Sequence, residues 1–304
     1  MGIRITQSLL TARTLRDVNG QLQNLSTLQE RLATGLRVNR PSDSPLDARR
    51  AISIRRGMAR SAQFVRNLNG LEPLMRASEG AFNSVTNIIQ RARELTIRAA
   101  NETFTQTELD MTAGEINQLL EQAVVESNRK IDGKTIFGGT HTKIEAFSVT
   151  RDPVTDRITA VNYDGNSETI NVQFSDSGFL AVNATGSNVF QSDVDIFSML
   201  IGIRDDMLAG DQDNLRNVRF GELDVSQDQI SRELTKIGAV ENRVLEIIIS
   251  TEDLILNLQE ELSDRVDADY AETIINFNVA QNSYQAALNA SARVIQNSLL
   301  DFLR

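Results

Sequence analysis

Apolar residues recur at alternating intervals of three and four at both ends of this 304-residue chain, and this heptad pattern constrains its fold most. The N-terminal stripe contains Leu15, Val18, Leu22, Leu25, Leu32 and Leu36, with Gln29 as its polar exception. The C-terminal end has one stripe of Val244, Ile248, Ile255, Leu258 and Leu262, and another of Ile274, Phe277, Tyr284, Leu288, Ile295 and Phe302. Stripes this narrow are typical of coiled-coil seams, so each terminal helix needs a partner helix.

The two ends carry opposite charge, which favours pairing of one end with the other. Residues 1–66 contain twelve arginines against four acidic residues, a net charge of +8, whereas residues 251–304 have a net charge of −6. Opposite charges beside a helical seam favour the intended partner over pairing of like with like. The alternative is two solvated faces whose charges never meet, because a single surface ion pair contributes only about 0–1 kcal/mol.

Periodicity and turn residues predict where helices begin and end. Helices are predicted over residues 7–34, from about 46 to a break at 70–73, over 74–101, over 105–128, and from 196 to the C-terminus with interruptions at Gly210 and Gly221. Gly35 ends the first helix, and Pro41 and Pro45 exclude helix from the segment that follows.

Between residues 138 and 195 the hydrophobic period changes from that of a helix to that of a strand. Alternating segments rich in Val, Ile, Thr and aromatic residues cover 146–150, 157–163, 168–174 and 180–183. Asp164-Gly165-Asn166 predicts a hairpin turn between the second and third of these segments. Gly138 and Gly139 mark the hinge from helix into this β-rich module.

The predicted fold is therefore mainly α, with an elongated antiparallel helical rod or coiled coil from both chain ends and a small β-rich inserted outer domain. The predicted domains are a terminal coiled-coil assembly domain (1–45 and 262–304), a helical rod domain (46–137 and 196–261) and the β-rich outer domain (138–195).

The composition contains little that could perform catalysis. Cysteine is absent, and His141 is the only histidine, in a Gly/Thr-rich turn without clustered carboxylates. Phe137-Gly138-Gly139-Thr140 lacks the Lys-Ser/Thr that a phosphate loop requires. We therefore predict no enzymatic activity, no metal site and no cofactor.

Nucleic-acid and membrane binding are also disfavoured. The net charge is −10, although the N-terminal stretch alone is basic. No apolar run reaches the roughly 18 residues of a membrane span, and the N-terminal residues lack the features of a cleaved secretory signal peptide.

Two segments resemble the bacterial flagellin superfamily, which includes flagellins and hook-associated proteins. Residues 32–45, LATGLRVNRPSDSP, resemble the N-terminal segment in which a helix ends at glycine and an extended spoke follows. Residues 90–101, QRARELTIRAAN, are similar to the rod helix of flagellins. The resemblance covers both helical ends and leaves residues from about 140 to 195 without a match.

Within the superfamily, three short segments favour the proteins that join hook to filament over flagellin. They are PSDSP at 41–45, IFGGTHT at 136–142 and SLLDFL at 298–303. Ser44 stands where those proteins have a second Asp, and Ala146-Phe147 where they have Pro-Phe. The alternatives are flagellin itself and a cytosolic coiled-coil scaffold or secretion chaperone, which would form a stable dimer with ordered ends.

The resemblance implies a structural subunit of the extracellular flagellum, exported by the flagellar type III system without a cleaved signal peptide and assembled at the hook–filament junction. It implies four kinds of partner: other copies of the chain in a ring, a hook-associated protein on the hook side, flagellin or an adjacent junction protein on the filament side, and a flagellar export chaperone. It implies neither nucleic acid nor membrane.

Assembly through the terminal helices would use their apolar stripes. The expected interface residues are Leu15, Val18, Leu22, Leu25, Leu32, Ile274, Tyr284, Leu288, Ile295 and Phe302. The expected hinge and spoke positions are Gly35, Pro41, Pro45, Gly138 and Gly139. For each interface residue the alternative is a place in the core of a single subunit.

Overall fold

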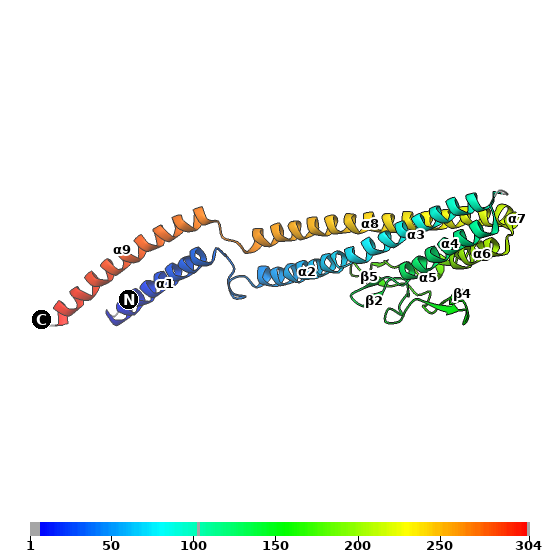
Figure 1. Ribbon diagram of the computed structural model, residues 1–304. Helices are drawn as coiled ribbons and strands as arrows, with labels where there is room; N and C mark the ends of the chain where they lie inside the picture. Colours follow the sequence, from blue (N-terminus) through cyan, green and yellow to red (C-terminus); the bar gives the residue numbers. More distant parts are fainter. Residues whose placement is uncertain (1–6, 102–103, 303–304) are drawn as a thin grey trace. The chain divides into compact units, whose positions relative to one another are not determined.

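The computed structural model describes residues 7–101 and 104–302 (Figure 1). The helices are α1 (Gln7–Thr34), α2 (Pro45–Asn69), α3 (Glu72–Ala99), α4 (Gln106–Ser127), α5 (Gly186–Phe190), α6 (Ile196–Ala209), α7 (Gln212–Asn214), the π-helix η1 (Leu215–Arg219), α8 (Phe220–Val266) and α9 (Tyr270–Phe302). The strands are β1 (Lys130–Ile131), β2 (Lys134–Thr135), β3 (Phe147–Arg151), β4 (Ile158–Tyr163), β5 (Asn171–Gln173) and β6 (Phe179–Ala181). The predicted fold class, helical ends with a small β-rich insert, is confirmed.

The chain divides into two compact units, residues 1–60 with 253–304, and residues 61–252. In the first unit α1 and α9 lie side by side and antiparallel (Figure 1). The predicted bounds of α1 are confirmed, because Gly35 takes a positive φ of 74° that ends the helix. Helices α2 and α8 contribute residues to both units. The three-part domain division made from the sequence stays a prediction.

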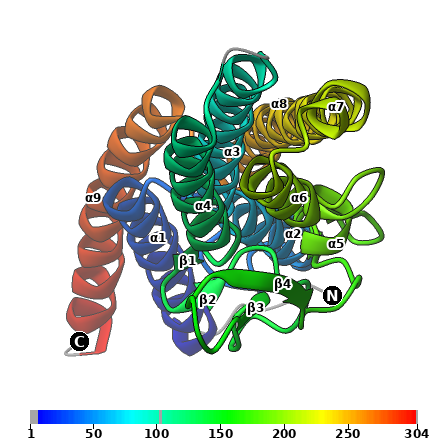
Figure 2. The same cartoon turned by 45° about the vertical axis from the view of Figure 1, so that its right-hand side comes forward.

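In the second unit α3, α4 and α6 pack together around an aromatic core (Figure 2). Helix α3 brings small residues such as Ala81 and Ala92, both 0% exposed, alongside the larger Phe82 and Ile89 on its buried face. The core then joins helix to β module through Phe82, Phe137, Phe147, Phe190 and Phe197, whose neighbouring rings lie 5.0–5.7 Å apart between centroids. Such spacing is typical of favourable aromatic contacts.

The strands form three separate antiparallel pairs, β1–β2, β3–β4 and β5–β6. The hairpin predicted at residues 164–166 is therefore wrong, since β4 pairs with β3 and not with β5. The side chain of Asn166 instead accepts a hydrogen bond from the Thr140 amide at 2.8 Å. Tyr163 Oη donates to either the Phe137 or the Asn166 carbonyl, at 2.9 and 2.7 Å. These bonds turn residues 164–166 back onto the glycine turn at 138–140.

Two further predictions about helix ends are corrected. Gly221 does not interrupt the chain, because η1 runs directly into α8 and the interior glycine costs only about 1 kcal/mol within this long helix. The C-terminal helix does break, between Val266 and Tyr270. There the backbone of Asp267 bridges to Leu36, and the Ala268 amide donates to the Gly35 carbonyl at 2.9 Å. This long-range pairing replaces helical hydrogen bonds with contacts to the spoke.

Candidate assembly surface

The α1/α9 pair buries one narrow stripe on each helix. On α1 the buried and half-buried residues at heptad spacing are Thr14, Val18, Gln21, Leu25, Leu28 and Leu32. On α9 they are Thr273, Phe277, Ala280, Tyr284, Ala287 and Ser291. We call these two sets the seam. Because it mixes small and polar residues with apolar ones, the seam buries less apolar surface than a leucine-rich coiled coil of the same length.

The structure divides the predicted interface residues into two groups. Val18, Leu25, Leu32 and Tyr284 are half-buried in the seam. Leu15, Leu22, Ile274 and Leu288 lie outside it and are 55%, 46%, 48% and 43% exposed. Ile295 and Phe302 belong to α9, but their side chains lie outside the described residues. An assembly role for these residues stays a prediction.

The sequence stripe and the seam differ by one position at Leu15 and Leu22. Thr14 and Gln21 occupy the seam positions instead. A one-residue step turns a side chain by roughly 100° around the helix, so the two leucines lie beside the seam and stay about half exposed. Apolar content alone could not have shown this, because at these two positions the apolar leucines are exposed while the polar Thr14 and Gln21 occupy the seam.

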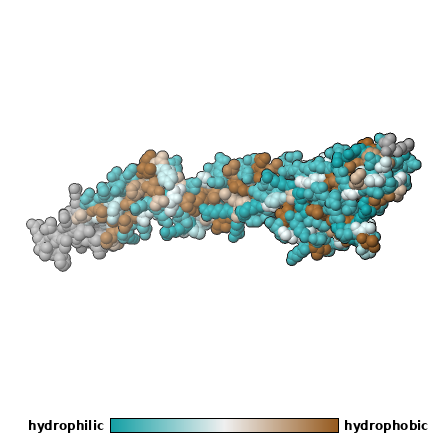
Figure 3. All heavy atoms as spheres, in the orientation of Figure 1, coloured by the Kyte–Doolittle hydropathy of each residue, from teal (hydrophilic) through white to brown (hydrophobic). Residues whose placement is uncertain are grey.

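Each helix of the pair therefore carries a second, uncovered apolar face. Ile275 and Val279, 63% and 59% exposed, add apolar surface on another side of α9. The space-filling view shows apolar atoms at the surface of the α1/α9 pair on the side that it presents (Figure 3). Single exposed apolar residues are ordinary, whereas larger exposed apolar patches are typical of protein interaction sites.

A spoke of non-helical chain, residues 35–44, links α1 to α2 and contacts the α8–α9 connection. The Arg37 amide donates to the Val266 carbonyl at 2.7 Å, and Arg37 Nη2 donates to the Arg265 carbonyl at 2.6 Å. Val38 and Val266 are 8% and 2% exposed in a small apolar cluster with Ala51. The spoke is thus fixed by backbone pairing and by its own small core.

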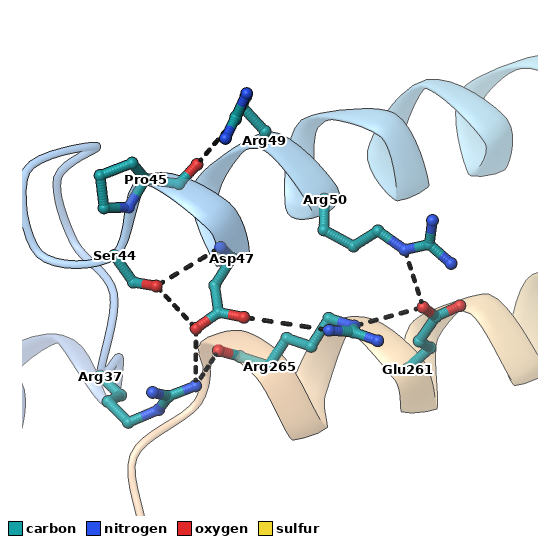
Figure 4. Close-up of polar contacts among 8 residues, drawn as sticks. All are labelled: Arg37, Ser44, Pro45, Asp47, Arg49, Arg50, Glu261 and Arg265. Carbon is teal, nitrogen blue, oxygen red and sulfur yellow. Dashed lines mark hydrogen bonds and ion pairs between the residues drawn. The ribbon is translucent and has the colours of Figure 1, made fainter.

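Charged side chains of three segments converge beside this cluster (Figure 4). Asp47 accepts hydrogen bonds from Ser44 Oγ at 2.8 Å and Arg37 Nη2 at 3.3 Å, and lies 3.9 Å from Arg265. Arg50 pairs with Glu261 at 3.3 Å. Because most of these groups are partly exposed, each pair adds only about 0–1 kcal/mol. The network orients the segments more than it stabilises them.

The predicted hinge and spoke positions occupy turns and a helix start. Pro41 lies in the turn at 41–43, and Pro45 is the first residue of α2, where its missing amide costs nothing. Gly138 and Gly139 lie in a buried turn, and Gly139 has a φ of 66°. A Cβ at Gly138 would lie 2.6 Å from the His141 carbonyl oxygen, so this turn requires glycine. Whether these residues act as hinges stays a prediction.

The spoke contains a carboxylate whose ionisation should matter. The Asp43 carboxylate accepts hydrogen bonds from the backbone amides of Arg40 at 2.8 Å and Asn39 at 3.0 Å. These bonds, with that from Arg40 first, hold the pKa of Asp43 below its ordinary value. Because folding lowers this pKa, its stabilising effect is present above the ordinary value and is lost as the pH falls through the lowered one.

We therefore expect the amide resonances of Asn39 and Arg40 to shift together as the pH falls through the lowered pKa of Asp43. Two-dimensional NMR of the labelled chain measures this shift. In the control variant Asp43→Asn the two resonances should not follow a carboxylate titration. The assignment is wrong if both resonances titrate identically in that variant.

Gly20 inside α1 and Gly35 just after its end should respond in opposite directions to alanine. At Gly35 the positive φ costs an L-residue about 1–2 kcal/mol, and the new Cβ would lie 2.8 Å from Tyr270 Oη. At Gly20, inside the helix, nothing lies within 4 Å of the new Cβ, so alanine should stabilise by about 1 kcal/mol.

Hydrogen exchange of the α1 amides measures both effects. Gly35→Ala should accelerate exchange in the last turn of α1 by about fivefold or more, and Gly20→Ala should slow exchange around position 20 by a similar factor. Equal effects of the same sign would contradict this account of the helix end.

The described residues contain no cluster of three or more side chains suited to a metal ion. None of their helices is long and apolar enough to span a bilayer. His141 is exposed in a turn, as the sequence predicts.

Comparison with known proteins shows which family has these helical regions. Residues 5–142 match the family model of the bacterial flagellin N-terminal helical region, and residues 221–303 match that of the bacterial flagellin C-terminal helical region. Together these regions take in more than two thirds of the chain. The chain belongs to the flagellin superfamily. The first matched region includes α1 and the second includes α9, the two helices that form the seam.

This flagellin-superfamily chain matches nearly the whole length of one curated relative and only a part of another. It is 22% identical to flagellar hook-associated protein 3 of Escherichia coli K12, over 95% of this chain and 96% of that protein. It is 32% identical to a flagellin of Salmonella typhimurium LT2, over 44% of this chain but only 26% of the flagellin.

Solved structures share its fold. A putative flagellar hook-associated protein from Vibrio parahaemolyticus has a TM-score of 0.66 and 16% identity, covering 74% of this chain and all of that structure. FlgL from Bacillus cereus has a TM-score of 0.57 and 23% identity, covering 69% and 99%.

Proposed function

We propose that this flagellin-superfamily chain is a structural subunit of the bacterial flagellum that joins hook to filament. The observation that carries the proposal is the match to hook-associated protein 3 along 95% of this chain and 96% of that relative. The Salmonella flagellin is matched over 26% of its length, so a role as filament subunit has less support. A cytosolic scaffold would not account for either match.

The uncovered faces of α1 and α9 give this role a physical basis. Leu15, Leu22, Ile274 and Leu288 stay between 43% and 55% exposed after the two helices have paired. Packing against neighbouring subunits would remove this apolar surface from water, at about 25 cal/mol per Å². The thin seam and the uncovered faces are therefore complementary, since the pair gains its full stability only in the assembly.

A junction subunit needs partners on several sides. We assign these as other copies of the chain in a ring, a hook-associated protein on the hook side, and flagellin or another junction protein on the filament side. Before export through the flagellar type III system, an export chaperone would shield the apolar faces. The chain contains no cysteine, so no disulfide has to be broken for passage through that channel or formed outside the cell.

Immunogold electron microscopy of intact flagella tests the proposal. The antibody is raised against residues 140–195. Almost all of this segment lies between the two matched family regions, which end at residue 142 and begin again at residue 221. One labelled band between hook and filament is expected. Label along the whole filament would make the chain a flagellin, and absence of flagellar label would return it to a cytosolic coiled-coil role.

A further inference from the structure

The first turns of α2 present a basic stripe on the face opposite their buried side. Arg49, Ile52 and Arg56 follow one another at intervals of three and four residues, and all three are exposed, Ile52 by 46%. Ala51 and Ile54, 4% and 5% exposed, mark the buried side. Neither arginine of the stripe forms an ion pair with another described residue, although Arg49 Nε donates to the Pro45 carbonyl at 3.2 Å (Figure 4).

The last turns of α8 present the same arrangement with the opposite charge. Asp253, Leu256 and Glu260 also follow at intervals of three and four, and all are exposed, Leu256 by 63%. Leu262 and Val266 mark the opposite, buried side. Within the part of the chain that the structure describes, neither carboxylate of this acidic stripe has an ion-pair partner.

The two stripes cannot meet within one chain. In the first compact unit these parts of α2 and α8 contact each other through the inner faces that carry Ala51 and Val266. The ion pair between Arg50 and Glu261 borders the same contact. The basic and acidic stripes lie on the two outer faces, so each is available only to another molecule.

We propose that the basic stripe of one copy of this chain docks on the acidic stripe of the next copy. The inference rests on the proposed function and names the surface through which copies of the chain meet. Matching intervals place Ile52 against Leu256, with each arginine beside a carboxylate. Because the two surfaces differ, the contact is head-to-tail, and such contacts generate rings or helical arrays when they repeat. Opposite charges also disfavour contact of a stripe with its own kind.

A disulfide trap tests the contact in assembled flagella, since the cysteine-free chain provides a clean background. In flagella whose junction subunit carries Ile52→Cys and Leu256→Cys together, mild oxidation should produce a ladder of covalent oligomers on a non-reducing gel. Either substitution alone should give none beyond a dimer. The matched control pairs Ile52→Cys with Leu254→Cys, which is also exposed, by 49%, but lies off the stripe and should give no ladder.

Charge exchange provides a second test. Arg49→Glu with Arg56→Glu, or Asp253→Arg with Glu260→Arg, should each lower incorporation about tenfold or more through like-charge contact. Coexpression of the two variants should restore it, because each then presents the complement of the other. These positions are exposed, so helix content should not change.

The outcomes separate this inference from the proposed function. A junction band in immunogold labelling together with no ladder, or no rescue by coexpression, would overturn the docking surface and leave the junction role standing. Absence of the band would overturn both.

Discussion

Aspartate at Leu22 or at Leu288 is expected to abolish incorporation of the chain into the flagellum while leaving the helix content of the free protein nearly unchanged. Both side chains are outside the seam, 46% and 43% exposed. A charge there remains hydrated in the free chain, but in the assembly it would be buried against a neighbour, at a cost of several kcal/mol. Electron microscopy of flagella measures incorporation, and far-UV circular dichroism measures helix content.

Two neighbouring polar positions provide matched controls for the same change. Gln23 and Asn289 are exposed on the same helices, so Gln23→Asp and Asn289→Asp add the same charge without removing an apolar contact. Both controls should assemble. Leu25→Asp differs from either set, because Leu25 is half-buried in the seam and its loss should also loosen α1 from α9. Incorporation of the Leu22 and Leu288 variants at the level of the controls would show that these faces are not assembly contacts.

Phe147→Ala is expected to lower the free energy of unfolding of the second compact unit by about 3–5 kcal/mol. Phe147 is 1% exposed, and its ring centroid lies 5.0–5.3 Å from those of Tyr163, Phe190 and Phe197. Removing the ring leaves a cavity where strand β3 joins the helical core, and the surrounding helices can close it only in part. Urea denaturation followed by circular dichroism and by tyrosine fluorescence measures the change.

A second phenylalanine of the β-rich segment serves as the control for this loss. Phe179 is 60% exposed, so Phe179→Ala should change the free energy of unfolding by no more than about 0.5 kcal/mol. Similar destabilisation by the two substitutions would show that the aromatic cluster is not the core that joins helix to strand.

Local chemistry was sufficient to predict most helix ends. Gly35 and Pro45 set the end of α1 and the start of α2 through their own backbone preferences. Thr105 and Glu108 form a capping box that opens α4, within a residue or two of the predicted start. Asp132-Gly133 between β1 and β2 is a turn signal of the same kind, and it could have predicted this small hairpin.

The candidate assembly surface was only partly predictable. The apolar stripes pointed to the helices that form the seam, but could not separate Leu15 and Leu22 on the uncovered face from Leu25 and Leu28 in the seam. Two adjacent faces of α1 are both apolar enough to serve, and only the position of α9 decides which one is buried. The unpaired charges on α2 and α8 could not be predicted from the sequence either, because total charge does not show which charged residues find an intramolecular partner.

By itself, then, the sequence determined the elements that depend on near neighbours: α1 with its glycine end, the capped α4, the buried face of α3 and the strand-forming segments between helical ends. The tertiary structure alone decided the pairing of β3 with β4, the break between α8 and α9 at Asp267, and the face of α1 that remains uncovered. The physical reason is range. Caps, turns and periodicity act over a few residues, whereas strand partners, the bridge from Leu36 to Asp267 and the register of two helices depend on contacts between residues far apart in the chain.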